Sequence, residues 1–265
     1  MIYQFDRATE NAIKNGDIPF LLQQLNDKPP CDFVYNLSHY LNGACNFGSH
    51  DTLKELLKLH KKHSNFDLTR GIVQHYLGGR AYSDLMSLSV KNHHNDCLRT
   101  LFEYIKPHNY WGQCTALVTQ CIQYAVSANN SKAIKIAVDF EKDCTPPEHY
   151  TVSNEIDLWW PRLQNKSKTQ AKQVVQYMDK TLVNHILVWR LHARSEHKGA
   201  LEALIERCNP KKVTTLISKT NLPPVCQIGP KDMKWLEDKL IAHQKAVLNK
   251  AVHGAKTAPR AQRKI

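Results

Sequence analysis

Apolar residues in this chain recur at intervals of three and four positions, and few segments alternate in steps of two. Spacing of three and four places side chains on one face of an α-helix, whereas steps of two are typical of a strand. The clearest stripe predicts one helix over residues 168–193. Its members are Val175, Met178, Leu182, Ile186 and Trp189. The pattern therefore predicts a protein that is nearly all α.

Three Pro-Pro pairs interrupt this pattern, at residues 29–30, 146–147 and 223–224. Proline lacks an amide donor and restricts the residue before it, so each pair predicts a loop between helices. Glycine is scarce, with 10 residues in 265, and the remaining glycines therefore become informative about turns.

Four segments of the first half repeat one pattern. A small residue is followed four positions later by a turn residue, nine later by an aliphatic residue and thirteen later by another apolar residue. The small residue lets two helices approach, and the turn residue can adopt the left-handed conformation that reverses the chain. The four sets are Ala12, Gly16, Leu21 and Leu25; Ala44, Gly48, Leu53 and Leu57; Ser89, His93, Leu98 and Phe102; and Ala125, Asn129, Ile134 and Val138.

This spacing resembles that of ankyrin repeats, whose unit is a helix–turn–helix of about 33 residues. The small residues lie 32, 45 and 36 positions apart, which indicates an insertion around residues 67–82. Leu41 occupies the family's leucine position, whereas the family's Thr-Pro-Leu-His box and the glycine after the second helix are absent. The resemblance covers residues 5–145 and implies stacked helical hairpins, an ankyrin-like solenoid.

The C-terminal half continues as helices with weaker periodicity, so we expect a divergent helical half. Residues 192–208 predict a fifth, degenerate hairpin. Its buried side would hold Leu201, Leu204 and Ile205. Two adjacent tryptophans, Trp159 and Trp160, predict a packing plug that closes the stack. The expected domains are ankyrin-like repeats over 1–145, a helical capping region over 146–244 and a basic, flexible tail over 245–265.

Composition limits the classes of protein. Apolar residues make up 42% of the chain and charged residues 23%, as in ordinary folded proteins, and no apolar stretch reaches the roughly 20 residues of a membrane helix. The first residues lack the apolar core of a secretory signal, and eight cysteines without a C-x-x-C pair are typical of a reduced intracellular protein. We expect a soluble, cytoplasmic protein, and delivery into a host-cell cytosol stays open.

The formal charge of +12 is concentrated at the end of the chain. From Lys239 onward there are seven lysines and arginines and no acid. Such a segment can contact nucleic-acid phosphates, an anionic membrane surface or an acidic protein. The candidate residues for an anion or an acidic partner are Lys245, Lys250, Lys256, Arg260, Arg263 and Lys264.

One motif suggests nucleophilic catalysis. Gly112-Gln113-Cys114 resembles the core around the nucleophile of transglutaminases and related papain-like enzymes. The resemblance implies a cysteine at a helix N-terminus, where the helix dipole favours the thiolate, and a nearby glutamine that stabilises an oxyanion. Thr115 replaces the family's tryptophan. The conceivable partners are His149, His185, Asp157 and Asp179; the alternative interpretation makes Cys114 a small packing residue.

Metal and cofactor motifs are absent from the sequence. There is no H-E-x-x-H pair, no phosphate-binding loop and no G-x-G-x-x-G motif. His192 and His197 are five residues apart and would face apart on a helix, while His60 and His63 have basic neighbours. We predict no metal and no cofactor.

The leading hypothesis is protein–protein recognition on the concave face of a helical repeat stack. Degenerate repeats with exposed His, Asn and Lys resemble ankyrin modules in effector proteins of intracellular bacteria and large DNA viruses, so we expect an effector-type protein. One alternative is a cysteine-dependent acyl transferase or protease centred on Cys114. Another is a nucleic-acid-binding helical protein that uses the basic tail. A non-enzymatic role is favoured.

Overall fold

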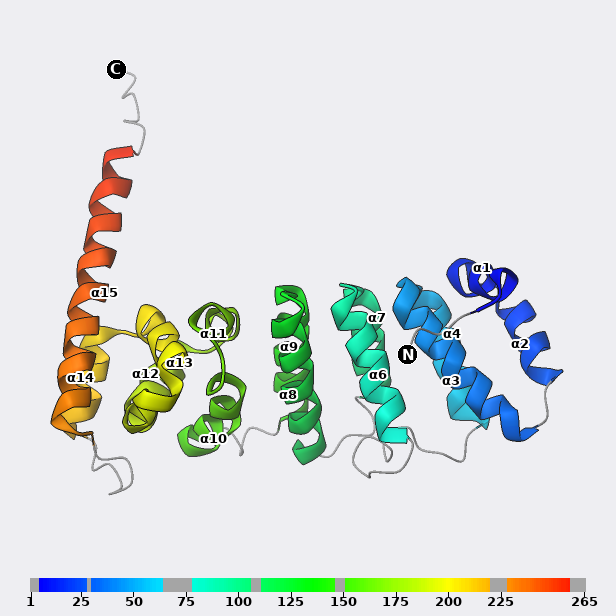
Figure 1. Cartoon of the computed structure of the whole chain (residues 1–265), viewed down its shortest axis with the longest axis horizontal. Coiled ribbons are helices and arrows are strands. Elements are labelled where there is room, and N and C mark those ends of the chain that lie inside the picture. The colour runs from blue at the N-terminus through cyan, green and yellow to red at the C-terminus, as the bar shows by residue number, and fades with distance from the viewer. Residues whose placement is uncertain are drawn as a thin grey trace, which may run out of the picture. The chain divides into compact units, whose positions relative to one another are not determined.

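The computed structural model describes residues 5–27, 30–63, 78–105, 111–145, 151–219 and 228–257. Within these ranges the chain forms α-helices and one short 3-10 helix, with no β-strand, so the predicted all-α class is confirmed (Figure 1). The chain divides into two compact units, Met1–Tyr150 and Thr151–Ile265, named unit 1 and unit 2 below.

The helices of unit 1 come in pairs joined by tight turns. Each pair consists of a first helix and a second helix, and the two pack against each other. The pairs are α1 (Arg7–Asn15) with α2 (Ile18–Asn26), α3 (Pro30–Phe47) with α4 (His50–His63), α6 (Gly78–Lys91) with α7 (Asn95–Ile105), and α8 (Trp111–Ser127) with α9 (Ser131–Cys144). The insertion expected around residues 67–82 lies mostly outside the described residues, and α6 includes its last part.

All four predicted turn residues adopt the left-handed conformation. The φ angles are 73° at Gly16, 77° at Gly48, 62° at His93 and 54° at Asn129. In every turn the carbonyl of the small residue accepts a hydrogen bond from the amide five positions later, over 2.8 to 3.0 Å. This bond closes the end of the first helix, as in common helix C-caps. The predicted helix–turn–helix units are therefore confirmed at these positions.

The residues that the pattern assigned to the interior are buried. The small residue of each pair is at most 6% exposed, which lets the two helices approach. The apolar residues of the second helices are at most 3% exposed. They are Leu21, Leu25, Leu53, Leu57, Leu98, Phe102, Ile134 and Val138. Burying such side chains is the main favourable contribution to folding, about 2 kcal/mol each.

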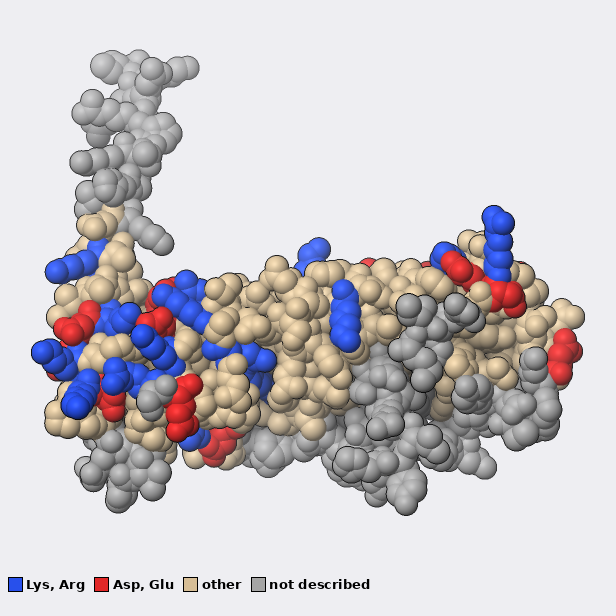
Figure 2. Space-filling view, in the orientation of Figure 1, with Lys and Arg blue, Asp and Glu red and all other residues tan. Residues whose placement is uncertain are grey.

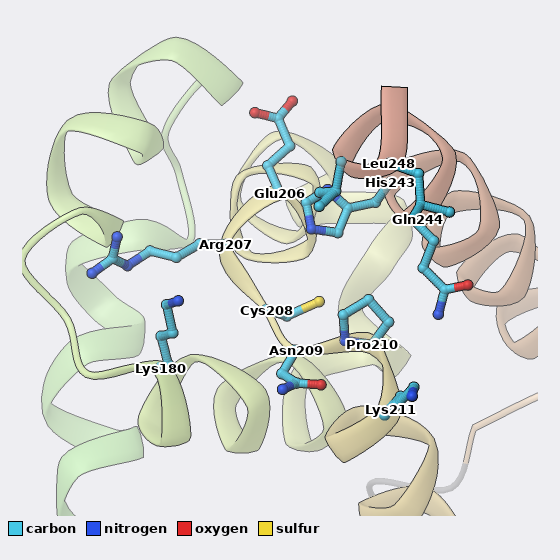
Figure 3. A pocket seen from close by; sticks show the side chains of 11 residues that line it. Lys180, Glu206, Arg207, Cys208, Asn209, Pro210, Lys211, His243, Gln244 and Leu248 are labelled. Atoms are coloured by element: carbon cyan, nitrogen blue, oxygen red, sulfur yellow. The ribbon is translucent and has the colours of Figure 1, made fainter. Parts of the chain in front are cut away.

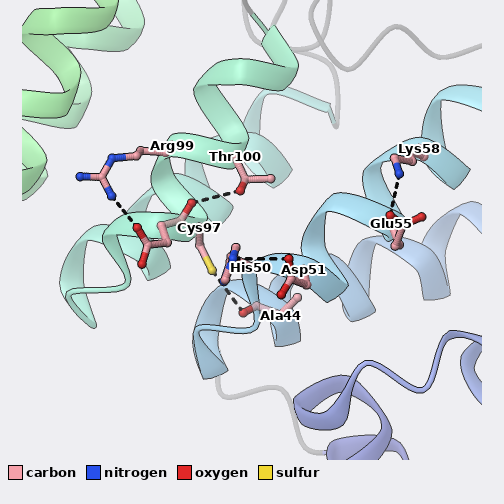
Figure 4. Close-up of polar contacts among 9 residues, drawn as sticks. Ala44, His50, Asp51, Glu55, Lys58, Cys97, Arg99 and Thr100 are labelled. Carbon is pink, nitrogen blue, oxygen red and sulfur yellow. Dashed lines mark hydrogen bonds and ion pairs between the residues drawn. The ribbon is translucent and has the colours of Figure 1, made fainter.

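Side chains also join each pair to the next. The hydroxyl of Thr52 donates to the carbonyl of Ile13 over 2.9 Å. Figure 4 shows the second contact, in which the Cys97 thiol lies 3.8 Å from the carbonyl of Ala44. Thr52 and Cys97 occupy the same place in their pairs, eight positions after the small residue. In the last pair Asn130 takes this role and donates to a carbonyl of α6 over 3.0 Å. The bond from Thr52 gives the Ile13 carbonyl a partner at its helix end, whereas the carbonyls of Ala44 and Val90 also accept backbone amides of their own turns.

Each helix of a pair packs on the corresponding helix of the next pair. The first helices contact one another in the order α1, α3, α6, α8, and the second helices in the order α2, α4, α7, α9. Unit 1 is thus an array in which each pair contacts its neighbours in the sequence.

Unit 2 contains shorter and less regular helices. They are α10 (Val152–Leu163), α11 (Lys168–Val175), α12 (Lys180–Arg190), the 3-10 helix η3 (Leu191–Ala193), α13 (Arg194–Arg207), α14 (Pro210–Lys219) and α15 (Pro230–Thr257). The prediction of one helix over 168–193 is wrong, because the chain breaks between α11 and α12. Asp179 causes the break: its carboxylate accepts a hydrogen bond from the Thr181 amide and caps a new helix.

The tryptophan pair and an arginine lie in the interior of unit 2. Trp159 and Trp160 are each 6% exposed, which agrees with the predicted packing role. Arg162 is fully buried, and its guanidinium carbon lies 4.9 Å from the centroid of the Trp159 ring. Stacking on an aromatic ring lets the planar guanidinium pack in an apolar region. The predicted burial of Leu201, Leu204 and Ile205 is confirmed.

The last helix, α15, extends into the segment that the sequence predicted to be a tail. The sequence predicted a flexible tail from residue 245, whereas α15 remains helical as far as Thr257. The reason lies in the composition between Pro230 and Gly254, which contains no other proline or glycine and many good helix formers. Residues 245–257 thus belong to a helix, and residues 258–265 lie outside the described part of the chain.

Candidate recognition surfaces

The outer side of α8 is free of charge. Residues 111–127 contain no Asp, Glu, Lys or Arg. Ala116, Gln123 and Ser127 are exposed on this helix, while Gln120 and Tyr124 are half-buried. Their spacing of three and four residues puts them on one side of the helix, opposite the buried residues that face α9. Uncharged polar and aromatic side chains of this kind are typical of the central part of protein interfaces.

Tyr124 connects this side of α8 with α6. Its hydroxyl accepts a hydrogen bond from Gln120 Nε2 over 3.0 Å, and Lys91 Nζ lies 5.8 Å from the centroid of its ring. The tyrosine ring is thus held from two helices before any partner arrives, which lowers the entropy lost on binding. We name the exposed sides of these helices the α6–α8 face. It comprises Leu88, Lys91, Ala116, Gln120, Gln123, Tyr124 and Ser127.

The second helices present a different surface. Their exposed charges form ion pairs within one helix, three or four residues apart (Figure 4 for the first two). These pairs are Lys58 with Glu55 at 2.6 Å, Arg99 with Asp96 at 2.5 Å and Lys135 with Asp139 at 2.5 Å. Such pairs stay hydrated and contribute little to stability. The second helices therefore carry an ordinary solvated surface.

A network of polar contacts fixes the turn edge of unit 1. Asn92 Nδ2 donates to Asn46 Oδ1 over 3.0 Å, and His94 Nε2 lies 3.0 Å from the carbonyl oxygen of Asn46. The ring of His94 packs so closely on Gly48 that a Cβ atom there would lie 2.5 Å from Nδ1. The turns between α3 and α4 and between α6 and α7 are therefore held together, which gives the α6–α8 face a rigid support.

Cys114 lies at the start of α8, as the sequence predicted, but its side chain is 0% exposed. Burial, together with the smaller effects of the nearby Cys144 and Glu141, raises the pKa of the thiol to about 12. A thiol with this pKa is almost entirely protonated at neutral pH, whereas the nucleophile is the thiolate. The surroundings of Cys114 thus favour the packing interpretation.

Three of the four conceivable acid–base partners of Cys114 belong to the other unit. His185, Asp157 and Asp179 belong to unit 2. His149 lies outside the described residues, and nothing is described of the Gln113 side chain. Within its described part, unit 1 therefore offers no acid–base pair that would support catalysis by Cys114.

The six basic candidates of the C-terminal segment fall into three groups. Lys245 is exposed on α15. Lys250 and Lys256 belong to the same helix, while Arg260, Arg263 and Lys264 lie outside the described residues. In the view of Figure 2, Lys and Arg side chains gather on unit 2, and few charges appear over the described part of α6–α9.

Two searches of the described residues bear on metals and membranes. Within the described ranges, no group of three or more His, Cys, Asp or Glu side chains is arranged to hold a metal ion. None of the described helices is both long and apolar enough to span a bilayer. His60, one of the histidines considered above, is 3% exposed, and burial lowers its pKa to about 4.

Comparison of the chain with protein-family models, with curated proteins and with solved structures finds no match. The argument for function therefore rests on the residues themselves. Sequence reasoning missed the α6–α8 face, although a signal was present: the 17 residues of α8 carry no charge in a chain that is 23% charged.

Proposed function

We propose that this protein is a protein-recognition module, an ankyrin-like stack of helical hairpins that binds a partner protein on its α6–α8 face. We further propose a cytoplasmic, effector-type role. The free cysteines support this location, because the six described ones carry no disulfide and five of them are buried. The concave face that the ankyrin resemblance implies would be formed by the first helices, to which α6 and α8 belong.

The observation that carries this proposal is the difference between α8 and the second helices α4, α7 and α9. These second helices carry charges paired within the same helix, whereas the exposed side of α8 has none. An uncharged polar surface loses little hydration on binding, and a positioned tyrosine supplies contact area at low entropic cost. Stability comes from the buried residues of each pair, so the exposed residues of the α6–α8 face can serve recognition without affecting the fold.

The test is capture from nuclease-treated lysate with the full chain and with a variant carrying Ala116→Arg and Gln123→Arg. Both positions are exposed on α8 and both substitutions keep good helix formers. We expect the variant to lose the partner that the unchanged protein captures, while its melting temperature changes by less than about 2 °C.

The matched control carries Gln23→Arg and Asn26→Arg, two exposed positions on the second helix α2. It adds the same charge to the other row of helices. Capture that survives in the control and fails in the α8 variant supports the proposal. Equal loss in both variants shows that added charge alone disrupts binding, and the proposal then fails.

A second candidate function is nucleic-acid binding through α15. The observation behind it is that exposed Lys245 belongs to a helix without acids beyond Asp238. This hypothesis predicts an affinity for single-stranded or duplex DNA that falls steeply with salt, with a smaller slope once residues 245–265 are removed. Binding that is absent at low salt, or unaffected by the removal, would refute it.

The enzyme hypothesis makes a separate prediction about thiol reactivity. Because burial raises the pKa of Cys114 to about 12, we expect it to react with iodoacetamide more slowly than Cys144, which is partly exposed. Mass spectrometry of the alkylated peptides at pH 7 measures both rates. A Cys114 that reacts fastest of all eight cysteines would restore the acyl-transferase or protease hypothesis.

A further inference from the structure

A groove lies beside α15 in unit 2, with a volume of about 690 Å³ (Figure 3). The beginnings of α12 and α14, the end of α13 and the second half of α15 line it. In Figure 3, Lys180 and Arg207 lie on one side, and His243, Gln244 and Leu248 on the other. We name it the α15 groove. The residues that matter for its chemistry are Lys180, Arg207, Lys211, His243, Val247 and Leu248.

The apolar side of the groove continues the stripe that attaches α15 to unit 2. Leu236 and Leu240 are 0% and 7% exposed, so this side of the helix packs into the interior. Val247 follows Leu240 by seven residues, or nearly two turns, and lies on the same side of the helix. It is nevertheless 51% exposed, and its neighbour Leu248 is 65% exposed. The stripe thus runs past the body of the unit, and a partner that covered it would bury apolar area.

The opposite side of the groove is cationic. Lys180 and Lys211 are exposed at the first turns of α12 and α14. Arg207 donates through Nη2 to the carbonyl of Met178 over 3.1 Å, while its Nε is buried without a hydrogen-bond partner among the described residues. In Figure 3 its guanidinium points away from His243 and Leu248, so Lys180 and Lys211 are the cations free to meet an anionic group.

The single acid of the groove does not neutralise these cations. Glu206 is bound on its other side, 2.7 Å from Lys168 and 2.6 Å from Lys172. Each helix N-terminus adds partial positive charge, and two of them, at Lys180 and Pro210, border the groove. The groove therefore combines an exposed apolar stripe with an uncompensated positive rim.

We propose that the α15 groove docks an acidic amphipathic helix of a partner protein, with its apolar side on Val247 and Leu248 and its carboxylates toward Lys180 and Lys211. Helix-in-groove recognition uses this combination of an apolar stripe and charged flanks. A nucleic acid would satisfy the cations but would leave the apolar stripe without a counterpart. A second copy of this chain would bring its own Lys245 and Lys250 against this positive surface, where like charges repel.

This proposal concerns unit 2 alone and goes beyond the proposed function of the α6–α8 face in unit 1. Either can fail without the other, because their test variants lie in different units.

The test measures fluorescence anisotropy of labelled designed peptides with the full chain. The main probe is a Leu/Glu peptide of about 18 residues with leucine at helical spacing of three and four. One comparison peptide has the same composition in scrambled order, and another has lysine in place of glutamate. We expect the ordered acidic probe to bind at least about tenfold more tightly than either comparison.

Two pairs of variants locate the binding site. Lys180→Glu with Lys211→Glu should weaken binding of the acidic probe at least about tenfold, whereas Lys54→Glu with Lys132→Glu, the same charge change on unit 1, should weaken it less than about threefold. Val247→Gln should weaken it about fivefold. Ile241→Gln is the matched control, because Ile241 is 50% exposed on α15 and does not line the groove.

Four outcomes would overturn the proposal. Equal binding of the ordered and scrambled acidic peptides would mean attraction of charge alone. Equal weakening by both charge-reversal variants would mean that the probe does not bind in the groove. Tighter binding of an oligodeoxythymidine, lost in Lys180→Glu with Lys211→Glu, would assign the site to nucleic acid. Self-association of the chain that disappears in Val247→Gln would assign the apolar stripe to a second copy.

Discussion

The two units of this chain hold their helices together by different means. In unit 1 the same backbone turn recurs four times, and side chains such as Thr52 and Asn130 connect each pair to the preceding one. In unit 2 the helices meet through individual side-chain contacts. These include Arg194 of α13 with Asp232 of α15 at 2.6 Å and Arg190 of α12 with Asp157 of α10 at 2.8 Å.

The difference shows what a repeated pattern contributes. A turn used four times constrains the residue type at each position, so any one turn is informative about the others. A contact such as that between Arg194 and Asp232 occurs once and joins residues 38 positions apart. Unit 1 can therefore vary its exposed residues for recognition. Unit 2 depends on side-chain contacts in which neither partner can be replaced without the other.

The largest loss of stability is expected in unit 2, from a substitution of Gly199. A Cβ atom there would lie 2.8 Å from both the Lys166 carbonyl oxygen and the Lys168 amide nitrogen. Backbone atoms cannot move aside as a side chain does, so Gly199→Ala should lower the free energy of unfolding by about 3 kcal/mol. Urea unfolding monitored by tryptophan fluorescence measures this, since four of the five tryptophans belong to unit 2.

Gly229→Ala is the control for that experiment, because the nearest atom to its Cβ is 3.9 Å away. It should change the free energy of unfolding by less than about 0.5 kcal/mol. A Gly199→Ala variant as stable as this control would show that the close crossing of α13 over the start of α11 is not essential to unit 2.

A smaller effect is expected from the turns of unit 1, where two glycines can be compared directly. Gly16 and Gly48 both have φ near 75°, but a Cβ at Gly16 meets only Thr52 Oγ1 at 3.5 Å, whereas one at Gly48 collides with the His94 ring. Gly16→Ala should cost about 1 kcal/mol from backbone strain alone.

Gly48→Ala should cost about 2 kcal/mol, because the His94 ring must also move. Hydrogen exchange of the peptides of unit 1 measures both variants. If His94 causes the difference, adding His94→Ala to Gly48→Ala brings the cost down to that of Gly16→Ala. Equal costs in the two single variants would mean that the turn edge does not couple neighbouring pairs.

The hydrogen bonds between neighbouring helix pairs predict the next effect on the free energy of unfolding. Thr52→Val removes the hydroxyl that donates to the Ile13 carbonyl and keeps the shape of the side chain. Leaving a buried carbonyl without its partner should cost about 1.5 kcal/mol in the free energy of unfolding of unit 1. Thr100→Val, at a partly exposed threonine whose hydroxyl bonds within its own helix, should cost less than about 0.5 kcal/mol by the same measurement. A smaller loss for Thr52→Val than for Thr100→Val would contradict the role of these bonds.

The smallest expected effect on stability is a dependence on pH. The pKa of His60 falls from 6.5 to about 4 in the folded protein because the ring is buried. The unfolded chain then binds more protons between these values, so the stability of unit 1 is fully present above pH 6.5 and is lost as the pH falls toward 4. Between pH 7 and pH 5.5 the loss should be about 1 kcal/mol. His60→Leu should reduce this slope and leave the part due to His39, whose pKa burial also lowers, whereas His50→Leu, at an exposed histidine, should leave the slope unchanged.

Much of unit 1 could be predicted from the sequence because its rules are local. A left-handed φ admits few residue types, and a buried aliphatic residue at fixed spacing leaves a visible pattern, as at Gly48 and Leu53. The break between α11 and α12 was missed because Val175 and Leu182 keep the same apolar spacing on both sides of it. The capping signal of Asp179 was present, but the stripe outweighed it.

The burial of Arg162 and the α6–α8 face could not be predicted in the same way. Arg162 and Trp159 are three residues apart on α10 and share one side of that helix, but the burial of this side depends on how α10 packs in unit 2. Likewise, the contact of Lys91 with Tyr124 depends on how α6 packs on α8, which joins residues 33 positions apart. Periodicity identifies the buried side of each helix, whereas the function of the exposed side depends on which helices become neighbours.

The central claim is that the α6–α8 face of unit 1 recognises a protein and that the second helix α9 does not. The most direct test places a photo-crosslinking amino acid at Gln123 on α8 or at Lys132 on α9, both exposed, and analyses the adducts by mass spectrometry. The account predicts a discrete protein adduct at Gln123 and none at Lys132. The same adduct from both positions, or an adduct from Lys132 alone, would contradict it.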